Sequence, residues 1–230
     1  MTIKENYLSI YENVDKICSS CGRNINDVKI IAVTKTRTVD EINQVIDAGA
    51  QIIGENRVQE LLHKYDYINE KAEKHLIGQL QTNKVKAIID KVDCIHSLDR
   101  ISLAQQIENI AQIRNLTPVK VLVEVNIGYE ITKSGILPDN LTEYLDILKN
   151  FRYIKPIGLM TVAPMDANVK EQNLYFEKMF NLLEIGKKHF GSSFCELSMG
   201  MSRDYETAIK HGATMIRLGT ALFGERNCNI

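Results

Sequence analysis

Short apolar runs rich in β-branched residues alternate with longer segments of helical periodicity along almost the whole chain. Such runs, bounded by turn residues, are typical of buried strands. We expect strands at residues 28–34, 51–54, 75–78, 94–97, 119–126, 154–161, 195–198 and 215–219. Helices are predicted after them at residues 39–47, 56–70, 84–91, 100–114, 138–148, 169–189, 204–210 and 221–223. Thr38 is predicted to cap the first of these, with Glu41 three residues on completing a capping box. One more amphipathic helix, residues 5–17, precedes the first strand.

Eight strand–helix units in sequence predict a (β/α)₈ TIM barrel, a fold that usually takes about 250 residues. A doubly wound open sheet shows the same alternation and is the alternative. No stretch has the composition of a linker, so we expect one domain over residues 1–230, with the extra helix at its N-terminus. A barrel would gather its chemistry at the C-terminal ends of the strands, and phosphate is often held after strands seven and eight.

Composition narrows the class of protein. The chain has 28 Lys and Arg against 29 Asp and Glu, so no broad basic field marks nucleic acid as a partner. No apolar run approaches the roughly 20 residues that span a bilayer, and no apolar signal segment follows Met1. Five scattered cysteines suit a reducing compartment, and we expect a cytoplasmic protein with no membrane partner. The lone Cys18–Cys21 pair predicts two ordinary thiols, because no second pair of ligands stands at zinc spacing.

Lys35 follows the first predicted strand, where alternation places it on the same face as Ile31 and Val33. In a barrel mouth with apolar walls, desolvation lowers the pKa of an ammonium and makes a neutral amine available to attack a carbonyl. A strand-end lysine that extends its amine to water is equally compatible with the spacing.

Small and hydroxyl residues follow strands seven and eight, where helices are predicted to begin: Ser198, Gly200, Gly219 and Thr220. Exposed N–H groups at such positions form an anion site, and ordinary capping is the alternative. Arg217 alternates toward the barrel interior, so it needs a partner, either a ligand or a structural carboxylate such as Glu196.

The remaining polar candidates have ordinary interpretations. Asn56 is predicted to cap the helix that follows it. Glu55 and Glu124 are candidate acids or bases, although strand-end carboxylates more often pair with Lys or Arg. His75 and His96 lie in predicted strands as core or mouth residues, and the histidines show no metal-ligand spacing.

A phosphate site beside an activated lysine indicates a phosphorylated aldehyde. Pyridoxal phosphate bound through a lysine Schiff base fits this pattern, and a Schiff-base aldolase acting on a sugar phosphate fits it too.

The sequence also resembles the pyridoxal phosphate homeostasis proteins, single-domain relatives of the alanine racemase barrel. The resemblance covers nearly the whole chain and rests on segments AVTKT (32–36), GENRVQE (54–60), HLIGQLQTNK (75–84), KSG (133–135), GLMT (158–161), LSMGMS (197–202) and RLGT (217–220). Arg57 departs from the aromatic residue common in the family, and Gln79 from proline or histidine. Both lie outside the lysine and phosphate motifs.

The resemblance implies a fold-type III barrel with pyridoxal phosphate on Lys35 and Arg217 at the pyridine nitrogen. It implies further contacts, with phosphate from Ser198, Gly200, Gly219 and Thr220, and with the rest of the pocket from Asn56, Met160 and His75. The family is thought to hold the cofactor and deliver it to apo-enzymes without robust catalysis. A pyridoxal-phosphate-dependent amino-acid racemase is the alternative. Alanine racemases carry an additional C-terminal β domain that supplies a tyrosine base, and the sequence ends at Ile230, just after the eighth unit. We therefore expect a non-catalytic protein, and a monomer rather than an obligate oligomer.

Overall fold

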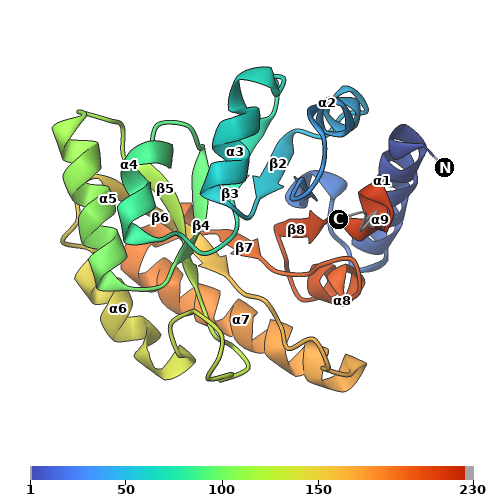
Figure 1. Cartoon of the computed structure of the whole chain (residues 1–230). Helices are drawn as coiled ribbons and strands as arrows, with labels where there is room; N and C mark the ends of the chain where they lie inside the picture. The colour runs from blue at the N-terminus through green and yellow to red at the C-terminus, as the bar shows by residue number, and fades with distance from the viewer. Residues whose placement is uncertain (1, 226–230) are drawn as a thin grey trace.

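Eight parallel strands close into a barrel in the computed structural model, which describes residues 2–225 (Figure 1). The strands are β1 Lys29–Val33, β2 Ile52–Glu55, β3 Glu73–Leu76, β4 Cys94–Leu98, β5 Val119–Glu124, β6 Ile154–Met160, β7 Glu196–Ser198 and β8 Met215–Leu218. Strand β1 pairs with β2 on one side and with β8 on the other. The predicted single-domain TIM barrel is confirmed, and the open-sheet alternative is wrong.

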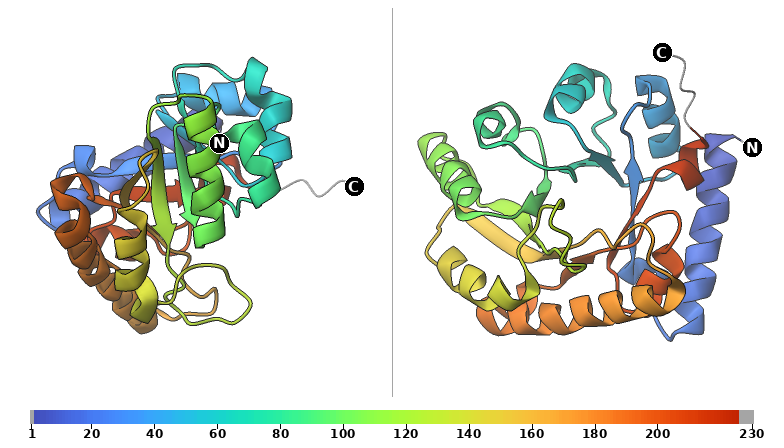
Figure 2. Two further views of the ribbon diagram at one scale, coloured as in Figure 1. Left: turned by 90° about the vertical axis from the view of Figure 1, so that its left-hand side faces the viewer. Right: turned by 60° about the horizontal axis from the view of Figure 1, so that its bottom comes forward.

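Helices lie outside the strands around the barrel (Figure 2). They are α1 Ile3–Ser20, α2 Val39–Asp47, α3 Val58–Lys64, α4 Val85–Ile88, α5 Ile101–Ile113, α6 Leu141–Leu148, α7 Val169–Phe190, α8 Tyr205–Lys210 and α9 Thr220–Phe223. Short 3₁₀ turns occupy Ile25–Asp27, Tyr65–Tyr67, Thr82–Lys84, Pro138–Asn140 and Gly191–Ser193.

The capping prediction succeeds at α2 and fails at α3. Thr38 and Glu41 form the expected capping box at the start of α2. At α3 the N-cap position is Arg57, without a side-chain cap, so the prediction that Asn56 caps this helix is wrong. The helix also ends at Lys64, where a 3₁₀ turn takes over, and is shorter than the predicted 56–70. Asn56 is thereby left for another role.

Helix α1 packs on the outer wall of the barrel beside α2, α8 and α9, as Figure 1 and the right-hand view of Figure 2 show. The Asn6 side-chain amide donates to the Leu222 carbonyl at 2.9 Å, and the Tyr7 hydroxyl donates to the Gly49 carbonyl at 2.9 Å. The N-terminal helix therefore covers the side of the barrel where α9 is only one turn long.

An apolar layer fills the middle of the barrel. We call this layer the apolar plug; its buried members are Ile31, Ile52, Cys94, Leu122, Met160 and Met215, with Ile77, Ile157 and Val162 packed against them. One cavity lies at the C-terminal ends of the strands and another at their N-terminal ends. The plug separates the two.

Two further expectations concern the chain as a whole. Within the described residues, none of the helices combines the length and apolar character needed to cross a membrane. Cys18 is a buried free thiol and Cys21 an exposed one.

Candidate functional site

The cavity at the C-terminal ends of the strands has a volume of about 550 Å³, a size typical of small-molecule sites. Five of the predicted binding residues line it, namely Lys35, Asn56, Arg217, Gly219 and Thr220. They follow or end strands β1, β2 and β8, which are adjacent in the barrel. Residues distant in sequence thus meet at the end of the barrel where this fold carries its chemistry.

The backbone on both sides of Lys35 is held by helix α3. Thr36 has φ 64°, a left-handed conformation that a β-branched residue rarely adopts. Its N–H donates to Glu60 Oε1 at 2.5 Å, and Lys64 Nζ donates to the Thr34 carbonyl at 3.3 Å. Lys64 also pairs with Glu60 at 2.6 Å. These contacts fix the turn from which the Lys35 side chain leaves.

Glu55 joins the ends of β1 and β2 beneath the cavity. Its carboxylate accepts hydrogen bonds from the Thr34 hydroxyl at 3.1 Å and from the Asn56 N–H at 2.8 Å, and Lys64 Nζ lies 3.7 Å away. Burial raises the pKa of this carboxyl group above its ordinary value. Glu55 is only 1% exposed and does not line the cavity, so its contacts are structural.

Asn56 lines the cavity and has a buried side-chain acceptor that is unsatisfied within residues 2–225. Its side-chain oxygen Oδ1 is buried and has no hydrogen-bond partner within residues 2–225. Such an atom is costly unless a ligand or solvent supplies the missing donor. The backbone of Asn56 is fixed by close contact with Gly78, where an added Cβ would lie 2.2 Å from the Asn56 carbonyl oxygen. The chain therefore holds this acceptor in one place.

Arg217 is 5% exposed and reaches the cavity from inside the barrel. It donates from Nη1 to the Ser198 hydroxyl at 2.7 Å and from Nη2 to the Thr161 carbonyl at 2.8 Å. Burial lowers its pKa to about 10, which leaves the guanidinium charged at neutral pH. Glu196, the carboxylate given as one alternative partner, does not pair with Arg217, because it begins β7 nearer the N-terminal end of the barrel and pairs there with Lys29.

The loops after β7 and β8 are tied together around the cavity. The Arg217 N–H donates to the Gly200 carbonyl at 2.9 Å, and the Ala221 N–H donates to the Ser202 hydroxyl at 3.3 Å. Within residues 2–225, the N–H groups of Gly219 and Thr220 have no hydrogen-bond acceptor. Two free donors beside the wall of the cavity are suited to an anion.

Four predicted site residues lie elsewhere. Gly200 contributes a carbonyl behind the wall, and Met160 belongs to the apolar plug. Ser198 is fully buried, and its hydroxyl contacts Arg217 and His96. His75 lines the cavity at the opposite end of the barrel.

The structure adds charged residues to the cavity that sequence reasoning missed, namely Arg37, Arg203 and Asp204. Asp204 Oδ1 accepts from the Met201 N–H at 2.6 Å, and burial raises the pKa of Asp204. These residues follow β1 and β7, so position after a barrel strand was the available signal.

Comparison with known proteins agrees with this geometry. The model of the alanine racemase N-terminal domain matches residues 6–227. The pyridoxal phosphate homeostasis protein of Aquifex aeolicus is 41% identical over 227 residues, covering 98% of this chain and 99% of that protein. This chain belongs to the pyridoxal phosphate homeostasis protein family. The family member from Escherichia coli strain K12 is 33% identical over 98% of this chain and 97% of its own length.

Solved structures of other proteins have the same barrel fold. PipY of Synechococcus elongatus, solved with pyridoxal phosphate bound, superposes with a TM-score of 0.85 at 30% identity, covering 97% of this chain and all of its own (100%). A protein of unknown function from Bifidobacterium adolescentis gives 0.91 at 33% identity, over 96% of this chain and 94% of that one. Alanine racemase from Corynebacterium glutamicum, at 15% identity and a TM-score of 0.73 over 96% of this chain and 62% of its own, shares the fold.

Proposed function

We propose that this chain binds pyridoxal 5'-phosphate in the C-terminal cavity, with Lys35 as the residue that holds it. The observation that carries the proposal is the meeting of Lys35, Arg217 and the Gly219–Thr220 turn in one cavity. PipY, which shares the fold at 30% identity, was solved with this cofactor. When bound, the cofactor supplies an aldehyde that a neutral lysine amine can take up as a Schiff base.

The residues present fit this ligand. Asn56 Oδ1 has no donor within residues 2–225, and the N–H groups of Gly219 and Thr220, which have no acceptor in that range, offer donors to a phosphate dianion. Arg217 keeps its charge and lies at the inner wall, where it would face a pyridine nitrogen and disfavour protonation of that nitrogen. Lys35, held from both sides by α3, would be positioned by the backbone before the ligand arrives.

We infer a carrier rather than an efficient catalyst. Apart from Lys35, the titratable side chains that line the described cavity are Arg37, Arg203, Asp204 and Arg217. Arginine does not release a proton near neutral pH. The Asp204 carboxylate already accepts the Met201 N–H. A racemase needs a base on each face of a carbanion, and this wall offers no committed second base.

The absorbance spectrum of the purified protein tests binding. Wild-type protein mixed with pyridoxal phosphate is expected to turn yellow, and borohydride is expected to fix the adduct on Lys35, as mapped by mass spectrometry of peptides. Lys35→Ala should abolish the colour, whereas Lys149→Ala, at an exposed lysine of the outer surface, should retain it. A colourless wild type, or an adduct on another lysine, would contradict the proposal.

Two further measurements separate carrier from enzyme. A carrier should transfer cofactor to an apo-enzyme faster than it releases cofactor into buffer, and equal rates argue against delivery. A racemase should exchange the Cα proton of some amino acid in deuterated water faster than free cofactor does. We expect no such exchange.

A further inference from the structure

A hydrogen-bonded chain of side chains runs through the barrel and joins its two cavities. The cavity at the N-terminal ends of the strands has a volume of about 480 Å³ and is lined by Glu73 and His75. Arg217, at the other end of this series of hydrogen bonds, lines the C-terminal cavity. The apolar plug lies between them, so the chain crosses a region from which water is excluded.

Each link of the chain is a direct contact. His75 Nε2 lies 3.1 Å from Glu73 Oε2, and His75 Nδ1 lies 2.9 Å from His96 Nε2. His96 Nδ1 lies 3.1 Å from Ser198 Oγ, and Arg217 Nη1 donates to the same oxygen at 2.7 Å. His75 is 2% exposed, and His96 and Ser198 are fully buried. Strands β3, β4, β7 and β8 each contribute at least one member.

The residues at the two ends of this series fix the direction of its hydrogen bonds. Arg217 can only donate, so Ser198 Oγ accepts from it, and His96 Nδ1 is the acceptor within residues 2–225 toward which the Ser198 hydroxyl can turn its own proton. His96 must then carry its proton on Nε2 and donate to His75 Nδ1, and His75 donates from Nε2 to Glu73. The hydrogen bond from His75 lowers the pKa of Glu73, which keeps that end an acceptor. The opposite direction would leave the Ser198 proton without an acceptor among residues 2–225.

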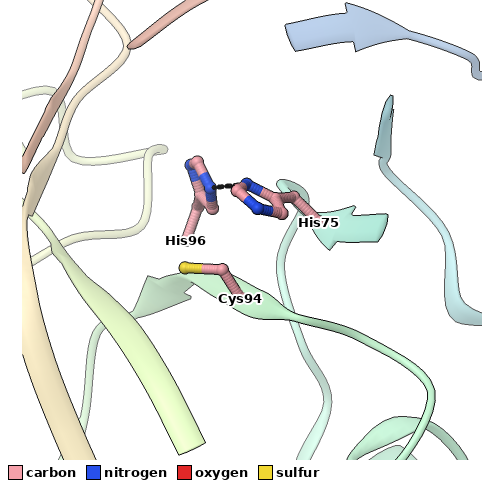
Figure 3. Close-up of side chains that lie close together, drawn as sticks. All are labelled: His75, Cys94 and His96. Carbon is pink, nitrogen blue, oxygen red and sulfur yellow. Dashed lines mark hydrogen bonds between the residues drawn. The ribbon is translucent and has the colours of Figure 1, made fainter. Parts of the chain in front are cut away.

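The same histidines lie near a thiol, which raises the question of a metal. Single ligand atoms of His75, Cys94 and His96 lie within 4.8 Å of one another, and Figure 3 shows the two rings in contact above the sulfur. Sequence spacing gave no sign of this cluster. All four imidazole nitrogens already have hydrogen-bond partners, and burial raises the pKa of the Cys94 thiol, which opposes the thiolate that a metal requires. The hydrogen-bonded chain is therefore the better explanation.

We propose that Glu73, His75, His96 and Ser198 form a directional hydrogen-bond relay that positions Arg217 and couples its position to the N-terminal face of the barrel. The relay would set how strongly Arg217 acts on a ligand in the C-terminal cavity. The effect on a ligand rests on the proposed function, whereas the direction of the relay does not. His75, His96 and Ser198 are positioning residues, since none of them lines the ligand cavity.

Charged groups at both ends act on the relay. At the N-terminal face, Lys29 and Lys120 act on Glu73, and Glu196 lies nearby at the start of β7. Within the barrel, His96 is influenced by His75 and Arg217, and Arg217 by Asp204 and Glu124. The open end is therefore the part of the relay that responds to solvent.

Nitrogen NMR of histidine-labelled protein without cofactor tests the direction. At pH 7.5, His75 and His96 are both expected to carry on Nε2 the ring proton that they donate along the relay. Glu73→Lys replaces the terminal acceptor with a donor, and it should move the His96 proton from Nε2 to Nδ1. Glu73→Gln retains an acceptor oxygen and should keep the wild-type pattern. Glu196→Lys makes the same charge change on the same face outside the relay, and should also leave His96 unchanged.

Cofactor binding then tests the effect on Arg217. Glu73→Lys should weaken pyridoxal phosphate about two- to tenfold, the range for one lost hydrogen bond, while Glu196→Lys should not. The relay is overturned if wild-type His96 is protonated on Nδ1, or if Glu73→Lys and Glu196→Lys give the same spectrum. Stoichiometric Zn²⁺ binding that removes both ring N–H signals would overturn it in favour of a metal site. If the wild type binds no cofactor, the proposed function fails, and the NMR result still decides the relay.

Discussion

The Lys64 ammonium donates a hydrogen bond to the Thr34 carbonyl over 3.3 Å, which ties helix α3 to the residue before Lys35. Glu60, one turn earlier in the same helix, accepts the N–H of Thr36 on the other side. The position of Lys35 therefore depends on a helix whose own side chains stay outside the cavity.

Replacing Glu60 by Ala should weaken cofactor binding about tenfold, because Lys35 would then have to be ordered on binding. Spectrophotometric titration with pyridoxal phosphate measures this change. Glu143→Ala, at an exposed position of α6, serves as the control and should bind as the wild type does. Equal affinities in the two variants would show that the α3 contacts do not position Lys35.

Asn56→Ala should separate stability from binding. It removes a buried acceptor that has no partner within residues 2–225, so the free energy of unfolding without cofactor should stay constant or rise by about 1 kcal/mol. The stabilisation added by pyridoxal phosphate should shrink. Thermal unfolding with and without cofactor measures both quantities. A large loss of stability in the cofactor-free variant would show that Asn56 is structural.

Gly78→Ala should lower the free energy of unfolding by about 2–4 kcal/mol, because its Cβ would lie 2.2 Å from the backbone oxygen of Asn56. Gly219→Ala provides the contrast. There the nearest atom to an added Cβ, in Val33, lies 3.5 Å away, an ordinary contact, so the free energy of unfolding should change by less than about 1 kcal/mol. Urea denaturation of both variants tests the difference.

The buried His96 predicts a dependence of stability on pH. Burial holds its pKa well below 6.5, so the folded protein keeps the ring neutral while the unfolded chain takes up a proton below about pH 6.5. The free energy of unfolding should therefore fall as pH decreases through this value, by at most about 1.4 kcal/mol per pH unit for this group.

Urea denaturation at pH 7.5, 6.5 and 5.5 measures how the free energy of unfolding changes with pH, in His96→Gln and in the wild type. Burial raises the pKa values of Glu55 and Glu124, so these two groups make the free energy of unfolding rise as pH decreases toward 4.5. Both proteins contain them, so the difference between the two curves reports His96. His96→Gln should show the smaller loss of stability on acidification. Parallel curves would mean that His96 titrates alike in the folded and unfolded states.

Local patterns in the sequence predicted most of the fold. Apolar runs located all eight strands, and the Thr38–Glu41 pair marked the start of α2 to the residue. Asn56 was misassigned because capping propensity is a local preference, whereas a turn fixed by Glu55 places the helix start two residues later. Local preference gives way to tertiary contacts there.

The binding cavity was partly predictable and the relay was not. Lys35 and Arg217 could be placed by strand alternation. Ser198 and His96 are 102 residues apart in sequence, and their contact depends on barrel closure and register. Glu60 and Lys64 have the spacing of an ordinary helical ion pair, which conceals their contacts with the turn at Lys35.

The apolar plug also limits the routes by which a ligand can enter and leave the C-terminal cavity. A molecule seated among Lys35, Asn56 and Arg217 cannot leave through the opposite end of the barrel, because side chains such as Leu122 and Met215 fill that route. Within residues 2–225, the segments that follow the strands line this cavity, so a ligand enters and leaves between them. A protein that takes the ligand directly from this cavity would have to bind over its opening and would cover Arg37, Met165 and Arg203. The cavity at the N-terminal ends of the strands, which is lined by several other lysines, would stay uncovered by that protein.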